Sequence, residues 1–316
     1  MKPVIASAAK QSSFVILFWI ASSLALLAMT GCAPQQQVYS PLAADETHLP
    51  LKSWLPKGKP KAIIIAVHGF NDYSNAFQTT GAFFKAHGIA VVAYDQRGFG
   101  RASYIGIWGN EKNLTSDLAE CVKQTSRRWL QAPIYILGES MGGAVAIAAL
   151  ADPTFPKVQG VILSAPALWG AETMNPLYHG SLWLAAHTWP SYRLSGRELH
   201  IMASDNILML EALGRDKLVI KQTRIDAIYG LVGLMDDAYE HISDVKTPVL
   251  LLYGAHDEVI PREPIEAARA RFTVPITFVY YPDGYHMLLR DIEGELVMRD
   301  ILSWMQCQIS KNKCHN

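Results

Sequence analysis

The segment from residue 134 to residue 150 constrains the fold of this chain more than any other. Its apolar beginning, Ile134-Tyr135-Ile136-Leu137, predicts a buried strand, and its small-residue end, Gly143 to Leu150, predicts a helix. Only the pentapeptide Gly138-Glu139-Ser140-Met141-Gly142 connects the two. A turn this sharp needs positions without side chains around the serine, which the two glycines supply. The pattern G-x-S-x-G in this context is typical of a nucleophile elbow, and the alternative is a glycine-rich turn whose serine caps the helix.

The rest of the chain alternates short β-rich apolar runs with helical patterns. This rhythm is typical of an α/β fold with a mostly parallel central sheet and crossover helices. Most of the runs are apolar at every position, as expected when helices cover both faces of the sheet. The expected strands are residues 62–68, 89–94, 134–137, 161–163, 249–253 and 276–280, with residues 51–54 as an edge strand.

The rhythm breaks between the runs at 161–163 and 249–253. Residues 167–241 contain no β-rich run and are too many for a structureless loop, so we expect a helical cap inserted into the core. Ligands of open α/β sheets bind at the carboxyl ends of the strands, where such a cap would lie. Its aromatic side chains either pack the cap onto the core or, taken as a group, line an apolar cleft for an acyl chain. The candidates for that cleft are Trp169, Tyr178, Trp183 and Trp189.

A serine nucleophile needs a base and an acid that orients the base. After a nucleophile elbow these partners follow in the order acid, then histidine, each behind a later strand. Asp257 follows the run at 249–253, and His286 follows the run at 276–280. We therefore expect Ser140, Asp257 and His286 to form a catalytic triad. Their neighbours His256, Glu258 and Asp283 are interpreted as loop and turn residues.

Two backbone N–H groups are needed to stabilise the oxyanion that forms when a serine attacks a carbonyl. One is expected from Met141, directly after the nucleophile, and the other from Phe70, in the loop after the strand at 62–68. Gly69 lets that backbone approach the substrate closely. His68 is expected to brace the loop instead of acting as a second base.

The first part of the chain has the features of an export signal. Lys2 and Lys10 precede an apolar run at residues 14–29, which is short for a membrane span. The run ends in Met29-Thr30-Gly31-Cys32, which resembles the lipobox of bacterial lipoproteins. The resemblance implies a signal peptide at 1–31, a lipid on Cys32, and a tether at 32–50. It places the protein in the bacterial cell envelope, anchored to the outer membrane and facing the periplasm. An uncleaved signal anchor and plain secretion are the alternatives.

Charge and cysteine content limit the kinds of partner and bound metal that we expect for this chain. The 28 basic and 28 acidic residues cancel, so nothing in the net charge indicates a nucleic acid or an electrostatically held membrane surface as partner. The 4 cysteines form no CxxC pair, and the histidines of the cap lack the spacing of metal ligands, so no metal site is expected. Cys307 and Cys314 lie close enough in the sequence to form a disulfide, whereas Cys121 is expected to be buried.

The motifs together resemble those of one known fold. His68-Gly69, the segment Asp95 to Gly100, the elbow around Ser140, Asp257 and His286 are similar to the corresponding motifs of the α/β-hydrolase fold. Within that fold the chain resembles the monoacylglycerol lipase and lysophospholipase group, the serine aminopeptidase S33 type, from about Ile63 to Trp304. The resemblance implies a hydrolase core at 51–166 and 242–316 around a cap at 167–241.

The same resemblance implies a serine ester hydrolase that needs neither a metal nor another cofactor. Its expected substrate is a small lipid ester, monoacylglycerol or lysophospholipid, cleaved through an acyl-enzyme on Ser140. A short-chain carboxylesterase and an acyltransferase are the alternatives among enzymes. The alternative from another class is a binding lipoprotein that keeps an inactive hydrolase fold.

Overall fold

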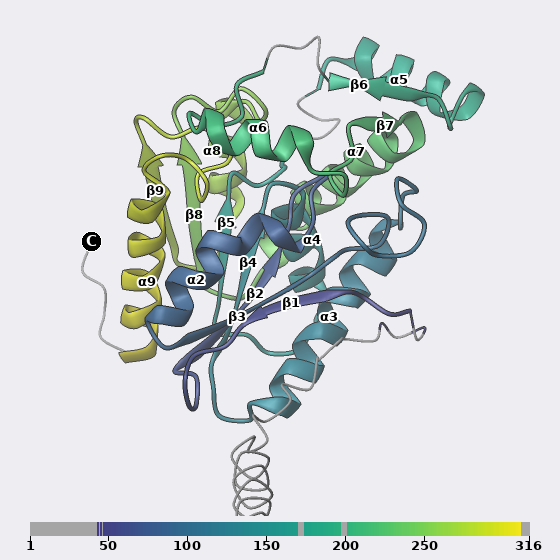
Figure 1. The fold of residues 1–316 in the computed structure, drawn as a ribbon. Coiled ribbons are helices and arrows are strands. Elements are labelled where there is room, and N and C mark those ends of the chain that lie inside the picture. Colours follow the sequence, from purple (N-terminus) through teal and green to yellow (C-terminus); the bar gives the residue numbers. More distant parts are fainter. Residues whose placement is uncertain (1–42, 44, 46, 170–173, 197–200, 311–316) are drawn as a thin grey trace, which may run out of the picture. The chain divides into compact units, whose positions relative to one another are not determined.

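The computed structural model describes residues 43, 45, 47–169, 174–196 and 201–310. A 7-stranded sheet runs through it in the order β1-β3-β2-β4-β5-β8-β9, and only β1 is antiparallel to its neighbour (Figure 1). Every predicted strand is present, with ends that differ by at most two residues, which confirms the predicted fold class. The strands are β1 (Leu51–Trp54), β2 (Ala62–Val67), β3 (Ile89–Tyr94), β4 (Ile134–Glu139), β5 (Gly160–Ser164), β8 (Val249–Gly254) and β9 (Ile276–Tyr281).

Both faces of the sheet are buried because successive strand residues point to opposite sides. In β2, for example, Ile63 and Ile65 belong to one apolar cluster while Ile64 belongs to the other. The first cluster packs against α3 (Glu111–Arg128), α4 (Met141–Ala151), α7 (Ile225–Glu240) and α8 (Arg262–Arg271). The second packs against η1 (Ser74–Phe77), α2 (Gln78–Ala86) and α9 (Gly294–Ser310), as Figure 1 shows. This arrangement explains why the central strands are apolar at every position.

The predicted insertion lies between β5 and β8. It contains α5 (Pro176–Thr188), β6 (Arg193–Ser195), α6 (Ile207–Arg215), β7 (Gln222–Arg224) and α7, followed by η3 (Ile242–Asp244). The cap was expected to be helical, but it also contains two strands, since β6 and β7 pair as a small antiparallel sheet. Each of these strands has only 3 residues, with sequences RLS and QTR, so neither leaves an apolar run in the sequence.

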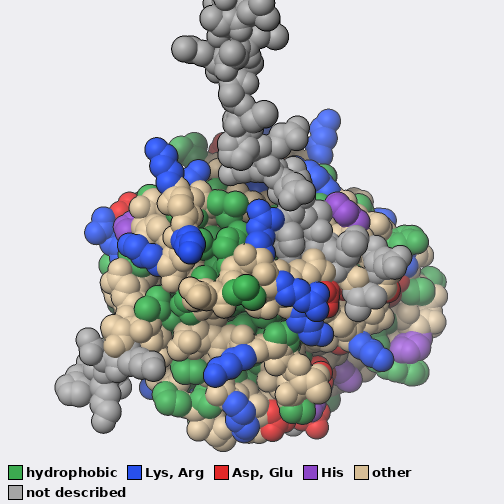
Figure 2. Space-filling model, turned by 90° about the horizontal axis from the view of Figure 1, so that it is seen from below, with side chains coloured by type: hydrophobic (Ala, Val, Ile, Leu, Met, Phe, Trp, Pro, Cys, Tyr) green, Lys and Arg blue, Asp and Glu red, His purple; other side chains and the backbone are tan. Residues whose placement is uncertain are grey.

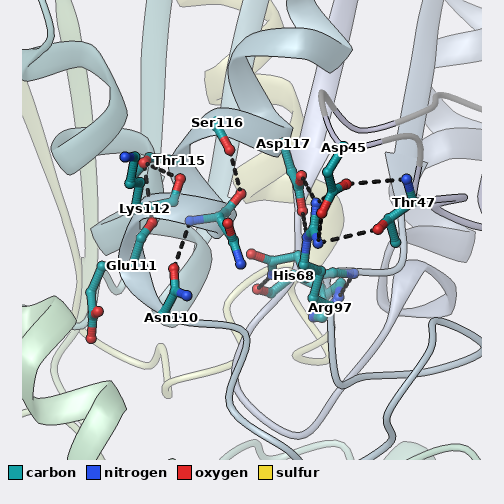
Figure 3. Close-up of polar contacts among 12 residues, drawn as sticks. Asp45, Thr47, His68, Arg97, Asn110, Glu111, Lys112, Thr115, Ser116 and Asp117 are labelled. Atoms are coloured by element: carbon teal, nitrogen blue, oxygen red, sulfur yellow. Dashed lines mark hydrogen bonds and ion pairs between the residues drawn. The ribbon is translucent and has the colours of Figure 1, made fainter.

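The chain before β1 is fastened to the core by Arg97. Its guanidinium group donates hydrogen bonds to Asp117 on α3 at 2.6 and 2.8 Å and to Asp45 at 2.7 and 2.8 Å (Figure 3). The hydrogen bond from Arg97 is the main reason that the pKa of Asp45 lies well below its usual range. Two carboxylates from distant parts of the sequence therefore share one cation, which holds the segment before β1 against α3.

Cys32 and Cys314 lie outside the described residues, so the lipid anchor and the Cys307–Cys314 disulfide stay predictions. Cys121 is buried, as expected. Over the described part of the chain, no helix combines the length and the apolar character needed to span a membrane.

Candidate active site

Ser140 occupies the single position between β4 and α4. Its backbone has φ 53° and ψ −118°, a left-handed conformation that residues with a side chain rarely adopt. Backbone hydrogen bonds hold it there: its N–H donates to the Ser164 carbonyl at 3.0 Å, and its carbonyl accepts from Ala167 at 2.9 Å. The serine is thus fixed in a strained turn at the carboxyl end of β4, as a nucleophile elbow requires.

The glycines on either side of Ser140 allow this turn to pack against the sheet. A Cβ atom on Gly142 would lie 2.0 Å from the carbonyl oxygen of Val67 in β2. A Cβ atom on Gly138 would lie 2.5 Å from the carbonyl oxygen of Gly142. Since both distances are far below van der Waals contact with backbone atoms that cannot move aside, any side chain at these positions would open the elbow.

Asp257 and His286 meet in the loops after β8 and β9. The Nδ1 atom of His286 lies 2.8 Å from Oδ2 of Asp257, and the side chains are 7% and 0% exposed. The other oxygen of Asp257 accepts hydrogen bonds from the N–H groups of Val259 at 2.8 Å and Ile260 at 2.9 Å. Because a carboxylate oxygen can only accept this hydrogen bond, Nδ1 carries the proton and donates it in the bond, and Nε2 is left as the basic nitrogen.

The neighbouring candidates have other contacts. Glu258 accepts a hydrogen bond from the N–H of Met202 in the cap at 2.7 Å. The His256 ring is exposed and stacks on Tyr285 with ring centroids 5.2 Å apart, and Asp283 is exposed. The structure therefore pairs His286 with Asp257, in agreement with the order of the motifs.

The loop after β2 lies directly against the nucleophile. A Cβ atom on Gly69 would be 3.3 Å from Cβ of Ser140, and Gly69 and Phe70 line the same cavity as Ser140. Among the described residues, the N–H groups of Phe70 and Met141 have no hydrogen-bond partner. These two N–H groups, without a partner near Ser140, are available for the predicted oxyanion hole.

His68 braces this loop from below. Its Nε2 accepts a hydrogen bond from the N–H of Gln96 at 3.0 Å, so its Nδ1 carries the proton and donates to the Gly69 carbonyl at 2.8 Å. Burial lowers the pKa of His68, which keeps the ring neutral. The side chain is fully buried and does not line the cavity, so it has the structural role expected from the sequence.

Ser140 and His286 line a cavity of about 390 Å³. Helix α7 supplies much of its apolar wall, with Ile228, Leu231 and Met235 at helical spacing. Trp169 also lines it, whereas Tyr178, Trp183 and Trp189 lie outside it on or just after α5, with 66%, 49% and 69% of their surface exposed. Helix α7 was not among the predicted walls of this cavity, although its apolar residues at 228, 231 and 235 have the spacing of one helix face.

A buried ionic cluster closes the polar end of this cavity. Arg290 donates hydrogen bonds to Asp72 at 2.7 Å and to Glu139 at 3.0 Å, and all three line the cavity. Burial alone would lower the pKa of Arg290, but the two carboxylates raise it. Burial raises the pKa of Glu139, and Arg290 offsets part of that effect. Arg290 thus ties together the oxyanion loop, the elbow and the histidine loop, a role that no sequence motif indicated.

Within the residues that the structure describes, no cluster of three or more His, Cys, Asp or Glu side chains has the geometry of a metal site.

Comparison with known proteins gives a consistent picture. Residues 58–293 match the family described as serine aminopeptidase, S33. The monoacylglycerol lipase of Mycolicibacterium smegmatis is 24% identical over 277 residues, which cover 80% of this chain and 90% of the lipase. An abhydrolase domain-containing protein of Dictyostelium discoideum is 24% identical over 274 residues, and this chain spans 29% of its length. The structure of Saccharomyces cerevisiae monoglyceride lipase with a substrate analogue superposes with a TM-score of 0.73 at 19% identity, covering 87% of this chain and 98% of the lipase.

Proposed function

Because this chain belongs to the serine aminopeptidase S33 family and is a carboxylic ester hydrolase, we propose that it cleaves lipid esters with one acyl chain, such as monoacylglycerol or lysophospholipid. The observation that carries the proposal is the cavity of about 390 Å³ above Ser140, which is apolar along α7 and polar at Arg290. Its volume lies within the range of small-molecule sites. The single acyl chain of an amphipathic ester would pack along α7, and its polar group would lie near Arg290.

In the proposed mechanism, Nε2 of His286 takes the hydroxyl proton of Ser140 as Oγ attacks the ester carbonyl. The negative charge moves to the carbonyl oxygen, which the N–H groups of Phe70 and Met141 stabilise. His286 then gives its proton to the alkoxide of the leaving alcohol, and an acyl group remains on Ser140. Water, deprotonated by His286, attacks this acyl-enzyme, and as the bond from the acyl carbon to Oγ breaks, His286 returns the proton to Oγ and the fatty acid is released. Asp257 stabilises the imidazolium at both stages through its 2.8 Å contact with Nδ1.

A panel of esters with increasing acyl length tests the substrate proposal. We expect kcat/KM for monoacylglycerols and p-nitrophenyl esters to rise with chain length, since each buried methylene group contributes about 0.8 kcal/mol, roughly fourfold. The variant Leu231→Trp, which places a larger ring in the α7 wall, should lower kcat/KM for long chains about 50-fold by excluding about three methylene groups. Acetate and butyrate esters should be nearly unaffected.

Leu208→Trp is the matched control, because Leu208 is 78% exposed on α6 and does not line the cavity. It should leave the whole profile unchanged. A profile that peaks at acetate in the wild type would instead identify a short-chain carboxylesterase. Monoacylglycerol consumed without release of fatty acid, in the presence of an acceptor alcohol, would identify an acyltransferase.

The lipid anchor is part of the same proposal. It is supported by the apolar run at residues 14–29 and the segment Met29-Thr30-Gly31-Cys32. In membranes washed with 1 M salt, which screens electrostatic attachment, substituting serine for Cys32 is expected to move the protein from the membrane fraction to the soluble fraction. If the variant stays with the membranes, the apolar run is an uncleaved signal anchor and the lipidation proposal is wrong.

A further inference from the structure

Basic side chains collect at the edge of the sheet opposite the active site. The catalytic side chains follow the carboxyl ends of the strands, so the connections that enter the amino ends lie on the other side of the molecule. Exposed basic residues lie in four of these connections or in the last turn of the helix that leads into them. They are Lys57, Lys59 and Lys61 before β2, Lys85 before β3, Arg127 and Arg128 before β4, and Lys157 before β5.

These connections are neighbours in space. In the sheet order β1-β3-β2-β4-β5, the strands start in register, with Ala62 opposite Ile89, Ile63 opposite Ile134 and Tyr135 opposite Gly160. The Lys61 side chain lies beside Gly88 of the adjacent connection. Figure 2 looks at the molecule from this side and shows Lys and Arg side chains spread across it. The seven residues named above therefore form one surface, called here the basic face.

Few acidic groups offset this charge. Within these four connections and the helix turns that lead into them, all of which the structure describes, the only carboxylate is Asp152. Its Oδ1 atom already accepts hydrogen bonds from the N–H and the hydroxyl of Thr154, both at 2.7 Å. Since the whole chain has no net charge, the excess of positive charge on the basic face is local.

An apolar side chain projects from the middle of the same face. Leu130 directly follows Arg127, Arg128 and Trp129 and is 87% exposed, the highest exposure among the exposed large apolar residues described. The guanidinium group of Arg128 lies 4.9 Å from the centre of the Trp129 ring. Trp129 itself packs against the core, so Leu130 is the apolar group that this segment exposes, and basic side chains beside an exposed leucine suit the interface of an anionic membrane.

We propose that the basic face rests on an anionic lipid surface. Its lysines and arginines would lie at the level of the lipid phosphates, with Leu130 inserted below them. A soluble polyanion would satisfy the charges but would leave Leu130 in water. In this orientation the cavity above Ser140 opens away from the membrane on which the protein rests.

Lysine footprinting of the full-length chain tests this orientation. The chain is bound to vesicles of phosphatidylcholine alone, or of phosphatidylcholine with an equal share of phosphatidylglycerol. The acetylation rate of each lysine is then measured by mass spectrometry. On the anionic vesicles we expect slower acetylation of Lys57, Lys59, Lys61, Lys85 and Lys157. Lys112, at the start of α3, and Lys217, in the cap, are exposed at the opposite end and should react equally on both vesicles.

Substitution of lysines shows which of them hold the protein on the anionic vesicles. Each basic residue near an anionic surface strengthens attachment by roughly fivefold, so replacing Lys57, Lys59 and Lys61 by glutamine should weaken it roughly 100-fold. Lys85 and Lys157 should then lose their protection, whereas Lys112→Gln with Lys217→Gln should leave it intact. At 1 M salt, where screening acts over about 3 Å, the protection should vanish. Equal acetylation on both vesicles, or protection of Lys112 and Lys217 instead, would overturn the proposal.

Discussion

Ser140→Ala is expected to lower kcat about 10⁴- to 10⁶-fold on any ester that the wild-type protein cleaves. In the proposed mechanism the hydroxyl oxygen of Ser140 is the atom that forms the acyl-enzyme, and the variant lacks it, while alanine fits the same turn. The hydroxyl of Ser140 is needed for chemistry and not for folding, so the thermal unfolding curve should match that of the wild type. Initial rates with a saturating ester, measured beside thermal unfolding, check both expectations.

Covalent labelling separates an active serine from an inactive fold. A fluorophosphonate probe should label the wild-type protein and Ser181→Ala, whose exposed serine lies on α5, but not Ser140→Ala. Because triad members act as a unit, adding His286→Ala to Ser140→Ala should cost little further activity. A wild-type protein that neither reacts with the probe nor cleaves esters would support the inactive binding lipoprotein. Labelling that survives in Ser140→Ala would place the nucleophile elsewhere.

The second large effect is expected on stability, from Arg290→Met. This change leaves Asp72 and Glu139 buried without their cation, and removing one partner of a buried ion pair costs about 3–5 kcal/mol of unfolding free energy. Urea unfolding followed by circular dichroism measures it. Arg299→Met is the matched control, since Arg299 is 67% exposed on α9 and its pair with Glu295 is worth at most about 1 kcal/mol.

Two further measurements show whether the uncompensated charges cause the loss. Adding Asp72→Asn and Glu139→Gln to Arg290→Met should restore much of the stability. The deficit of Arg290→Met should also shrink as the pH falls. Burial raises the pKa of Glu139 and Arg290 lowers it, so removing Arg290 raises this pKa further in the folded variant. The folded variant then binds a proton that the unfolded chain has already released, and acid favours its folding more than that of the wild type. A deficit that is independent of pH would point to lost packing instead.

The sequence was sufficient for the parts of the site that are encoded locally. Ser140, Asp257 and His286 each follow a strand within a few residues, so the strand pattern alone brings their loops to one edge. The Arg290 cluster could not be foreseen, because its partners are 218 and 151 residues away and pairing at that distance leaves no periodic signal. Two strands of the cap were missed because they are too short to show a pattern. The aromatic residues of α5 indicated an acyl cleft, yet the wall beside Ser140 is built largely by the plainer apolar stripe of α7.

The cap is joined to the core at Ala167, whose N–H bonds to the Ser140 carbonyl, but the nucleophile, the base and the acid all come from loops of the central sheet. Substitutions on the exposed faces of α5 or α6 can therefore change the cap without replacing any of these three side chains. Selection can move such an enzyme from one ester to another in single steps, each of which still works. Because the sheet and the insertion are separate, the preference for one ester over another can change in the cap while the three side chains on the sheet stay the same.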